Sequence, residues 1–137
     1  GHDFTHLSES LTLDSIEYFL FPNAFFFPGL SLPMVYRFRP DPESPDYCYF
    51  DLIFMRPRPS DSKVPDPPEV ITLDIDESYS IVEGVGPLGK IYDQDTANLA
   101  AQTRGFKSSF KRGETLGNYQ EIRVRHLQKR VLDFLNA

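Results

Sequence analysis

Two aspartates two positions apart, Asp93 and Asp95, are the residues whose type and spacing best suit chemistry in this chain. They follow a glycine-rich approach, residues 84–89, and stand where an alanine-containing helix is predicted to begin. Either carboxylate could therefore cap that helix as a hydrogen-bond acceptor. A carboxylate held in this way suits a metal ligand or a general base. The simpler interpretation is a pair of acids that cap a helix in solvent.

Helical spacing indicates where Asp95 should point. Within residues 91–106, Leu99, Gln102 and Phe106 fall on the same face as Asp95. The pattern predicts that the acid and this partly apolar stripe face a pocket together.

Composition limits the class of protein that must position these acids. A chain of 137 residues with 40% hydrophobic content is long enough for one domain with a real core. The net charge of −6 argues against a nucleic-acid partner, and the longest apolar run, residues 18–32, is too interrupted to span a membrane. The lone Cys48 offers neither an internal disulfide nor a CxxC spacing, which is typical of a reducing cytoplasm.

The aromatic content is high for a chain of this size, with 12 Phe, 7 Tyr and no Trp. Such rings either pack a core or line a cavity for an apolar ligand, and composition alone leaves both interpretations open.

The first half of the chain reads as strands after a short leader. Residues 1–12 are interpreted as a leader that begins with a Gly-His tag remnant, and residues 13–137 as the domain. Strands are predicted at residues 16–21, 25–27, 34–39 and 47–55, with turn residues between them. The last of these carries apolar side chains on both faces, so it is expected to lie centrally in a sheet.

The second half reads as a loop and then two helices. Proline-rich residues 56–68 predict a loop, residues 70–73 a short edge strand and residues 74–83 an acidic, solvated segment. A second helix is predicted at residues 118–135, with an inward apolar stripe and a basic face interpreted as solvated. The stripe is Val124, Leu127, Val131 and Phe134; the basic face is Arg123, Arg125, Lys129 and Arg130. Strands joined by turns and followed by helices favour an α+β class with an antiparallel sheet.

The histidines limit the chemistry that is available. Only His2, His6 and His126 are present, two in the leader and one in the basic-faced helix, which fits poorly with a nucleophile, histidine and acid triad. Residues 84–89 match GxGxxG only as a string, and zinc would require more Cys or His. Non-haem iron differs, because two histidines and one carboxylate suffice, so one aspartate beside an aromatic pocket could supply a third of such a site.

Four separated motifs carry a resemblance to a known family. They are DSIEYFLFPN at residues 14–23, MVYRFRP at 34–40, YDQDTANL at 92–99 with Arg104-Gly105 behind it, and YQEIRVRH at 119–126. Together they resemble the C-terminal catalytic domain of Rieske-type ring-hydroxylating oxygenase α subunits, in unbroken order over nearly the whole chain. The resemblance implies the helix-grip (START/SRPBCC-like) fold, an antiparallel sheet curved around a long C-terminal helix.

The resemblance also implies site residues. Matching the motif around Asn98 places the carboxylate ligand of a mononuclear Fe(II) on Asp95, with Asp93 as the second choice. The same matching puts Val85 and Ile91 in the substrate pocket, although simple core packing explains two apolar residues equally well. Thr103, before Arg104-Gly105, departs from the glutamine that is usual in the family.

Other parts of the family's machinery have no counterpart in this sequence. The Rieske domain with its 2Fe-2S cluster and the helix with the two histidine ligands are not matched, and His2 and His6, although four positions apart, lack the flanking residues. Residues 13–137 are therefore expected to be the C-terminal part of a catalytic domain, inactive and weak in iron binding when isolated.

In the parent enzyme, the resemblance implies electron delivery by a reductase or ferredoxin, activation of O₂, and hydroxylation of an aromatic or other apolar substrate. It also implies homotrimers. The alternative hypothesis is a non-catalytic helix-grip module that binds apolar ligands without a metal.

Overall fold

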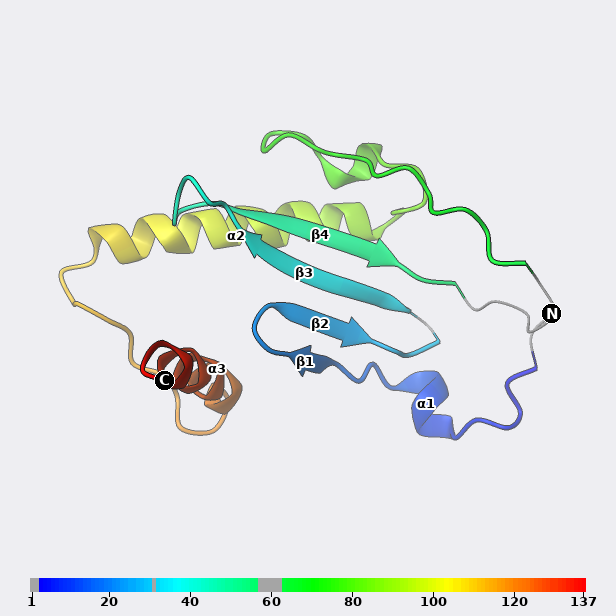
Figure 1. Cartoon of the computed structure of the whole chain (residues 1–137), viewed down its shortest axis with the longest axis horizontal. Helices are drawn as coiled ribbons and strands as arrows, with labels where there is room; N and C mark the ends of the chain where they lie inside the picture. The colour runs from blue at the N-terminus through cyan, green and yellow to red at the C-terminus, as the bar shows by residue number, and fades with distance from the viewer. Residues whose placement is uncertain (1–2, 31, 57–62) are drawn as a thin grey trace. The chain divides into compact units, whose positions relative to one another are not determined.

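The computed structural model describes residues 3–30, 32–56 and 63–137, and Figure 1 labels its helices and strands. The tag remnant and residues 57–62 of the predicted loop lie outside the described residues. In chain order the elements are α1 (Glu9–Leu13), β1 (Tyr18–Leu20), β2 (Ala24–Phe27), β3 (Met34–Pro40), β4 (Cys48–Phe54), the 3₁₀ helix η1 (Tyr79–Ile81), α2 (Leu88–Ser108) and α3 (Ile122–Leu135).

The chain divides into two compact units. Unit 1 comprises Gly1–Asp61 and Leu116–Ala137, and so holds α1, the four strands and α3. Unit 2 comprises Ser62–Thr115 and holds η1 and α2. Both predicted aspartates belong to unit 2.

Unit 1 is built on an antiparallel sheet with strand order β1-β2-β3-β4. All four predicted strands are present, and the α+β class is confirmed. The prediction that residues 47–55 form a central strand is wrong for the described sheet, because β4 pairs only with β3 and lies at the edge. Its two-sided apolar pattern therefore leaves Ile53 and Phe54 exposed.

One face of the sheet is lined with aromatic rings. Phe25 of β2, Phe38 of β3 and Phe50 of β4 form a continuous row, with ring centroids 6.1 Å apart for the first pair and 4.7 Å for the second. Tyr36 extends the row, since its ring lies 4.8 Å from Phe27 and 5.3 Å from Phe50. This arrangement follows from the alternation of side chains along each strand, which puts every second residue on one face.

The opposite face carries an ion-pair cluster. Arg37 on β3 stands directly opposite Asp51 on β4, and its Nε donates to the carboxylate at 2.7 Å. Arg39 donates to the same carboxylate through Nε at 2.8 Å and Nη2 at 3.0 Å. The hydrogen bond from Arg39 is the main reason that the pKa of Asp51 lies below its usual range.

The helices depart from prediction mainly at their N-terminal ends. α1 lies in the segment interpreted as a leader, where Ser8 caps it by accepting from the Leu11 N–H at 3.3 Å. α2 begins at Leu88, five residues before Asp93, the first of the two aspartates at which it was predicted to begin. The edge strand predicted at residues 70–73 is not formed. None of the described helices combines the length and apolar character needed to cross a membrane.

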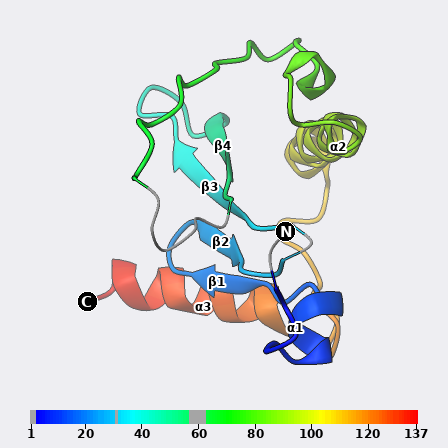
Figure 2. The ribbon, with the colours of Figure 1, turned by 90° about the vertical axis from the view of Figure 1, so that its right-hand side faces the viewer.

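The C-terminal helix α3 is amphipathic but little buried. Of its predicted inward stripe, only Leu127 is half-buried, and Val124, Val131 and Phe134 are exposed. Phe134 nevertheless packs on Phe21 at the β1–β2 turn, with centroids 5.0 Å apart, in the region where Figure 2 shows α3 beside the hairpin. The inward orientation of the stripe was therefore predicted correctly only in part.

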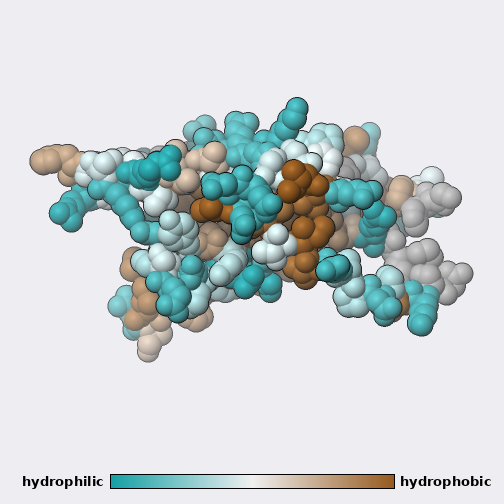
Figure 3. Space-filling model, turned by 90° about the horizontal axis from the view of Figure 1, so that it is seen from above, coloured by the Kyte–Doolittle hydropathy of each residue, from teal (hydrophilic) through white to brown (hydrophobic). Residues whose placement is uncertain are grey.

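The described core is small. Four hydrophobic residues are buried: Met34, Val35, Val85 and Tyr92. The real core that composition predicts is thus not formed by the described residues, and Figure 3 shows strongly hydrophobic groups open to solvent.

Candidate functional site

The start of α2 sets the geometry of the candidate site. Gly84 and Gly86 have φ values of 94° and 58°, a region of backbone conformation that favours glycine, and they turn the chain just before the helix. Pro87 then stands at the N-cap position and Leu88 is the first helical residue. Proline suits a helix start because its missing N–H would be unpaired there. Asp93 and Asp95 consequently lie in the second turn, and the prediction that one of them caps α2 is wrong.

Asp93 instead binds the N-terminal end of η1, whose N-cap residue is Ser78. Its Oδ2 accepts the Ser78 hydroxyl at 2.6 Å and its Oδ1 accepts the Tyr79 N–H at 2.9 Å. The hydrogen bond from Ser78, followed by that from Tyr79, holds the pKa of the Asp93 carboxyl below its usual range. Both oxygens of Asp93 are therefore used within unit 2.

Asp95 has a different environment two positions later. Its side chain is exposed, and its carboxylate makes no hydrogen bond or ion pair with any described residue. Leu99, Gln102 and Phe106 are exposed with it, so the prediction that this stripe faces a pocket is not met among the described residues. The Asp95 oxygens remain available to a ligand. Its assignment as an iron ligand stays a prediction.

The two predicted pocket residues lie on either side of the α2 start. Val85 is buried, with 8% of its surface exposed, in the loop before the helix. Ile91 is on the first turn of α2 and is 49% exposed. The structure therefore does not bring them together into one apolar lining, and their role in substrate binding stays a prediction.

Sequence reasoning did not identify the residues that hold this region together. Gly89 allows Ser80 to lie against α2, since a Cβ at that position would be 2.7 Å from Ser80 Cα. Tyr92 is 2% exposed and its ring lies 5.7 Å from that of Tyr79. The acidic residues of the segment 74–83 are exposed as predicted. The serine and tyrosine within it were overlooked because acids dominate its composition, although Ser78 is a typical helix-capping residue.

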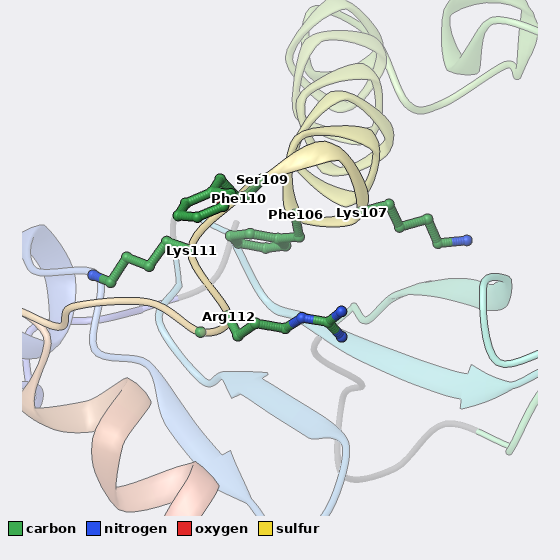
Figure 4. Close-up of a pocket in the computed structure, with 7 residues that line it drawn as sticks. Phe106, Lys107, Ser109, Phe110, Lys111 and Arg112 are labelled. Carbon is green, nitrogen blue, oxygen red and sulfur yellow. The ribbon is translucent and has the colours of Figure 1, made fainter.

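A separate hollow of about 590 Å³ lies at the other end of α2. Figure 4 shows Phe106 and Phe110 near one another while Lys107, Lys111 and Arg112 extend in different directions. Phe106 follows Asp95 by about 16 Å along the helix axis. This hollow is therefore not the pocket predicted beside the aspartate.

The described residues do not form an iron site on their own. Among them, no group of three or more His, Cys, Asp or Glu side chains is placed to hold a metal ion. His6 and His126 belong to unit 1, and His2 lies outside the described residues. The single carboxylate of Asp95 fits one arm of a two-histidine, one-carboxylate set, and no complete set of this kind is found within the described part of the chain.

A protein-family model matches almost the whole chain. The model of the ring hydroxylating alpha subunit, catalytic domain, matches residues 3–137. Comparisons with curated proteins and with solved structures gave no significant match.

Proposed function

Because the chain belongs to the family of ring hydroxylating alpha subunit catalytic domains, we propose that it supplies Asp95 as the carboxylate ligand of a mononuclear non-haem iron. The family consists of oxygenases that use O₂ and an electron donor on aromatic substrates, and it implies a non-haem iron in the catalytic domain. We further propose that two histidines from other residues of the catalytic domain complete the site, and that a Rieske cluster in another domain delivers electrons.

The observation that carries this proposal is the contrast between the two aspartates. The Asp93 carboxylate accepts hydrogen bonds at both oxygens, from Ser78 and Tyr79, so its orientation is fixed toward η1 and a metal would have to share those oxygens. The Asp95 carboxylate has no such partner among the described residues and can turn toward a ligand with all of its lone pairs open. The structure therefore favours Asp95 over Asp93.

The chain's own residues would position rather than transform the substrate. Bound iron would supply the activation of O₂, and Asp95 would hold it through a hard anionic oxygen. Val85 and Ile91 would contact an apolar substrate at the start of α2.

The proposal is tested by metal content in the complete α subunit that carries this sequence. Asp95→Asn keeps the shape of the side chain but removes its charge, so iron per chain, measured by elemental analysis, should fall several-fold. Gln94→Ala, at the exposed neighbour, is the matched control and should retain its iron. Equal iron in Asp95→Asn and the wild type would refute the assignment.

The 137-residue chain should bind iron only weakly when isolated. One carboxylate gives little affinity without its imidazole partners. After anaerobic incubation with Fe(II) and desalting, we expect much less than one iron per chain. One tightly held iron per chain would contradict this expectation.

A second candidate function is a non-catalytic module that binds apolar ligands, and the aromatic row on the sheet favours it. Tyr36 lies in that row, between Phe27 and Phe50, so an apolar ligand on this face should change tyrosine fluorescence. Titration with naphthalene in the presence and absence of Fe(II) separates the two functions. Binding that is independent of Fe(II), in a complete protein that holds no iron, would favour the module.

A further inference from the structure

The loop between η1 and α2 is closed by contacts from one face of α2. Gly89, Tyr92 and Asp93 lie at the helical spacing that places residues on one face, and each contacts the 78–80 segment. We call this set of contacts the η1–α2 clasp. It joins residues that are 14 and 15 positions apart at the two Asp93 hydrogen bonds.

Three kinds of contact form the clasp, and one of them is directional. Gly89 gives close backbone approach, and the rings of Tyr79 and Tyr92 give apolar contact. The Asp93 carboxylate alone fixes the register of η1 against α2, because its two oxygens separately accept the Ser78 hydroxyl and the Tyr79 N–H. Charge-assisted hydrogen bonds of this kind are stronger than neutral ones.

The closed loop contains Val85 between two glycines with positive φ. Gly84 and Gly86 give the loop backbone freedom that other residues would lack. Two short-range hydrogen bonds lie along the loop. The Val85 N–H donates to the Val82 carbonyl oxygen at 3.3 Å, and the Gly89 N–H donates to the Gly86 carbonyl oxygen at 3.2 Å. The position of Val85 relative to α2 therefore depends on how firmly the clasp closes the loop.

We propose that Asp93 is a positioning residue. It holds the segment 78–87, which comprises η1 and the loop after it, on α2 and thereby fixes Val85 relative to Asp95. This inference rests on the proposed function, in which Asp95 binds iron and Val85 contacts the substrate. Asp93 touches neither iron nor substrate. Of the two aspartates, Asp95 binds the iron and Asp93 orients the loop that carries Val85.

The test compares two variants that open the clasp by different means. Asp93→Asn presents one acceptor oxygen and one amide group to two donors. Ser78→Ala removes the hydroxyl, which donates to Asp93 and accepts from the Ser80 N–H. Both should speed amide hydrogen exchange in residues 78–86 about tenfold, while exchange in residues 97–106 of α2 stays unchanged. Gln94→Ala is the control on the same helix. Ser78→Thr keeps the hydroxyl that Ser78→Ala lacks, so its amide exchange should be as slow as in the wild type.

Two further readouts in the complete α subunit separate positioning from metal binding. Asp93→Asn and Ser78→Ala should weaken naphthalene binding about fivefold, measured by fluorescence titration, and retain the wild-type iron content. Ser78→Thr should restore the affinity. Asp95→Asn should instead lower the iron content.

The possible results distinguish the two proposals. Unchanged exchange and naphthalene affinity in both clasp variants, with iron lost in Asp95→Asn, would overturn the positioning role and leave the proposed function intact. Loss of iron in Asp93→Asn would show that Asp93 is itself a ligand and would also overturn the positioning role. Retention of iron in Asp95→Asn would refute the proposed function and, with it, the role given to Asp93.

Discussion

Asp93 and Asp95 show how two identical side chains on one helix can acquire different chemistry. Asp93 meets donors from the segment before the helix, and its hydrogen bonds stabilise the ionised form. Asp95 is rotated about 160° around the helix from it and faces solvent in the described chain. The spacing of the two acids identified them as candidates, but their different partners depend on residues 14 and 15 positions away, which no local pattern contains.

Glycine 89 gives a prediction at the residue scale. Gly89→Ala places a Cβ 2.7 Å from Ser80 Cα and 2.8 Å from its backbone nitrogen, so the segment must shift. We expect a loss of stability of about 1–3 kcal/mol, measured by urea denaturation followed by helical circular dichroism. Gly105→Ala on the same helix meets no atom within 4 Å and should raise stability by about 0.5–1 kcal/mol. Equal effects of the two substitutions would contradict the close approach of Ser80 to α2.

The ion-pair cluster on the sheet gives a pH-dependent prediction. Because the folded pKa of Asp51 is depressed, its contribution to stability is present above the unfolded pKa of about 4 and is lost as pH falls through the folded pKa. Asp51→Asn should therefore cost about 0.5–1 kcal/mol near pH 7, a modest value since both arginines are about half exposed.

Urea denaturation at two pH values checks this prediction. The difference between Asp51→Asn and the wild type should shrink as the pH is lowered from 7 to about 2, because protonation removes the charge that the two arginines bind. Glu43→Gln, at an exposed acid in the turn before β4, serves as the control for the general effect of lost charge. A difference that is equal at both pH values would contradict the role of the Asp51 charge.

Among the elements, strands were easier to predict than helix boundaries. Alternation and aromatic content located β1 to β4 to within a few residues. Successive side chains on a strand point to opposite faces, so apolar and polar residues alternate in the sequence itself. The edge position of β4 could not be predicted, since pairing depends on the whole sheet. α1 was missed because a five-residue helix shows no full apolar period. The start of α2 was missed because Pro87 was not considered as its N-cap.

The contact between α3 and the β1–β2 turn gives a prediction at the element scale. Phe134→Ala removes the ring that lies 5.0 Å from Phe21, so unit 1 should lose about 0.5–1.5 kcal/mol of stability, measured by urea denaturation. Phe110→Ala is the matched control, because that ring is fully exposed beyond the end of α2. Equal stability of the two variants would show that the Phe21 contact contributes nothing.

For the whole molecule, the family and the α+β class could be inferred from the sequence, but the amount of buried surface could not. Motifs at residues 14–23, 92–99 and 119–126 lie far apart in the chain and agree with the family match over residues 3–137. Composition predicts a core because it counts apolar residues. It does not indicate which residues would cover them. In the described residues many apolar groups, including Ile71, are left exposed.

This exposure gives a prediction about the isolated chain. Open apolar surface should bind the dye ANS and increase its fluorescence several-fold, and thermal unfolding should be broad. The same chain in concentrated guanidinium, where surface clusters are dispersed, is the control. Absence of dye binding together with a sharp unfolding transition would show that the apolar groups are covered in solution.

The central claim is that the exposed Asp95 carboxylate, and not that of Asp93, binds iron. A crystal structure of the iron-loaded complete α subunit, with anomalous scattering recorded at the iron edge, tests it most directly. We expect an iron peak bonded to an Asp95 carboxylate oxygen, with Asp93 still accepting hydrogen bonds from Ser78 and Tyr79. An iron peak bonded to Asp93, or one with Asp95 turned away into solvent, would contradict it.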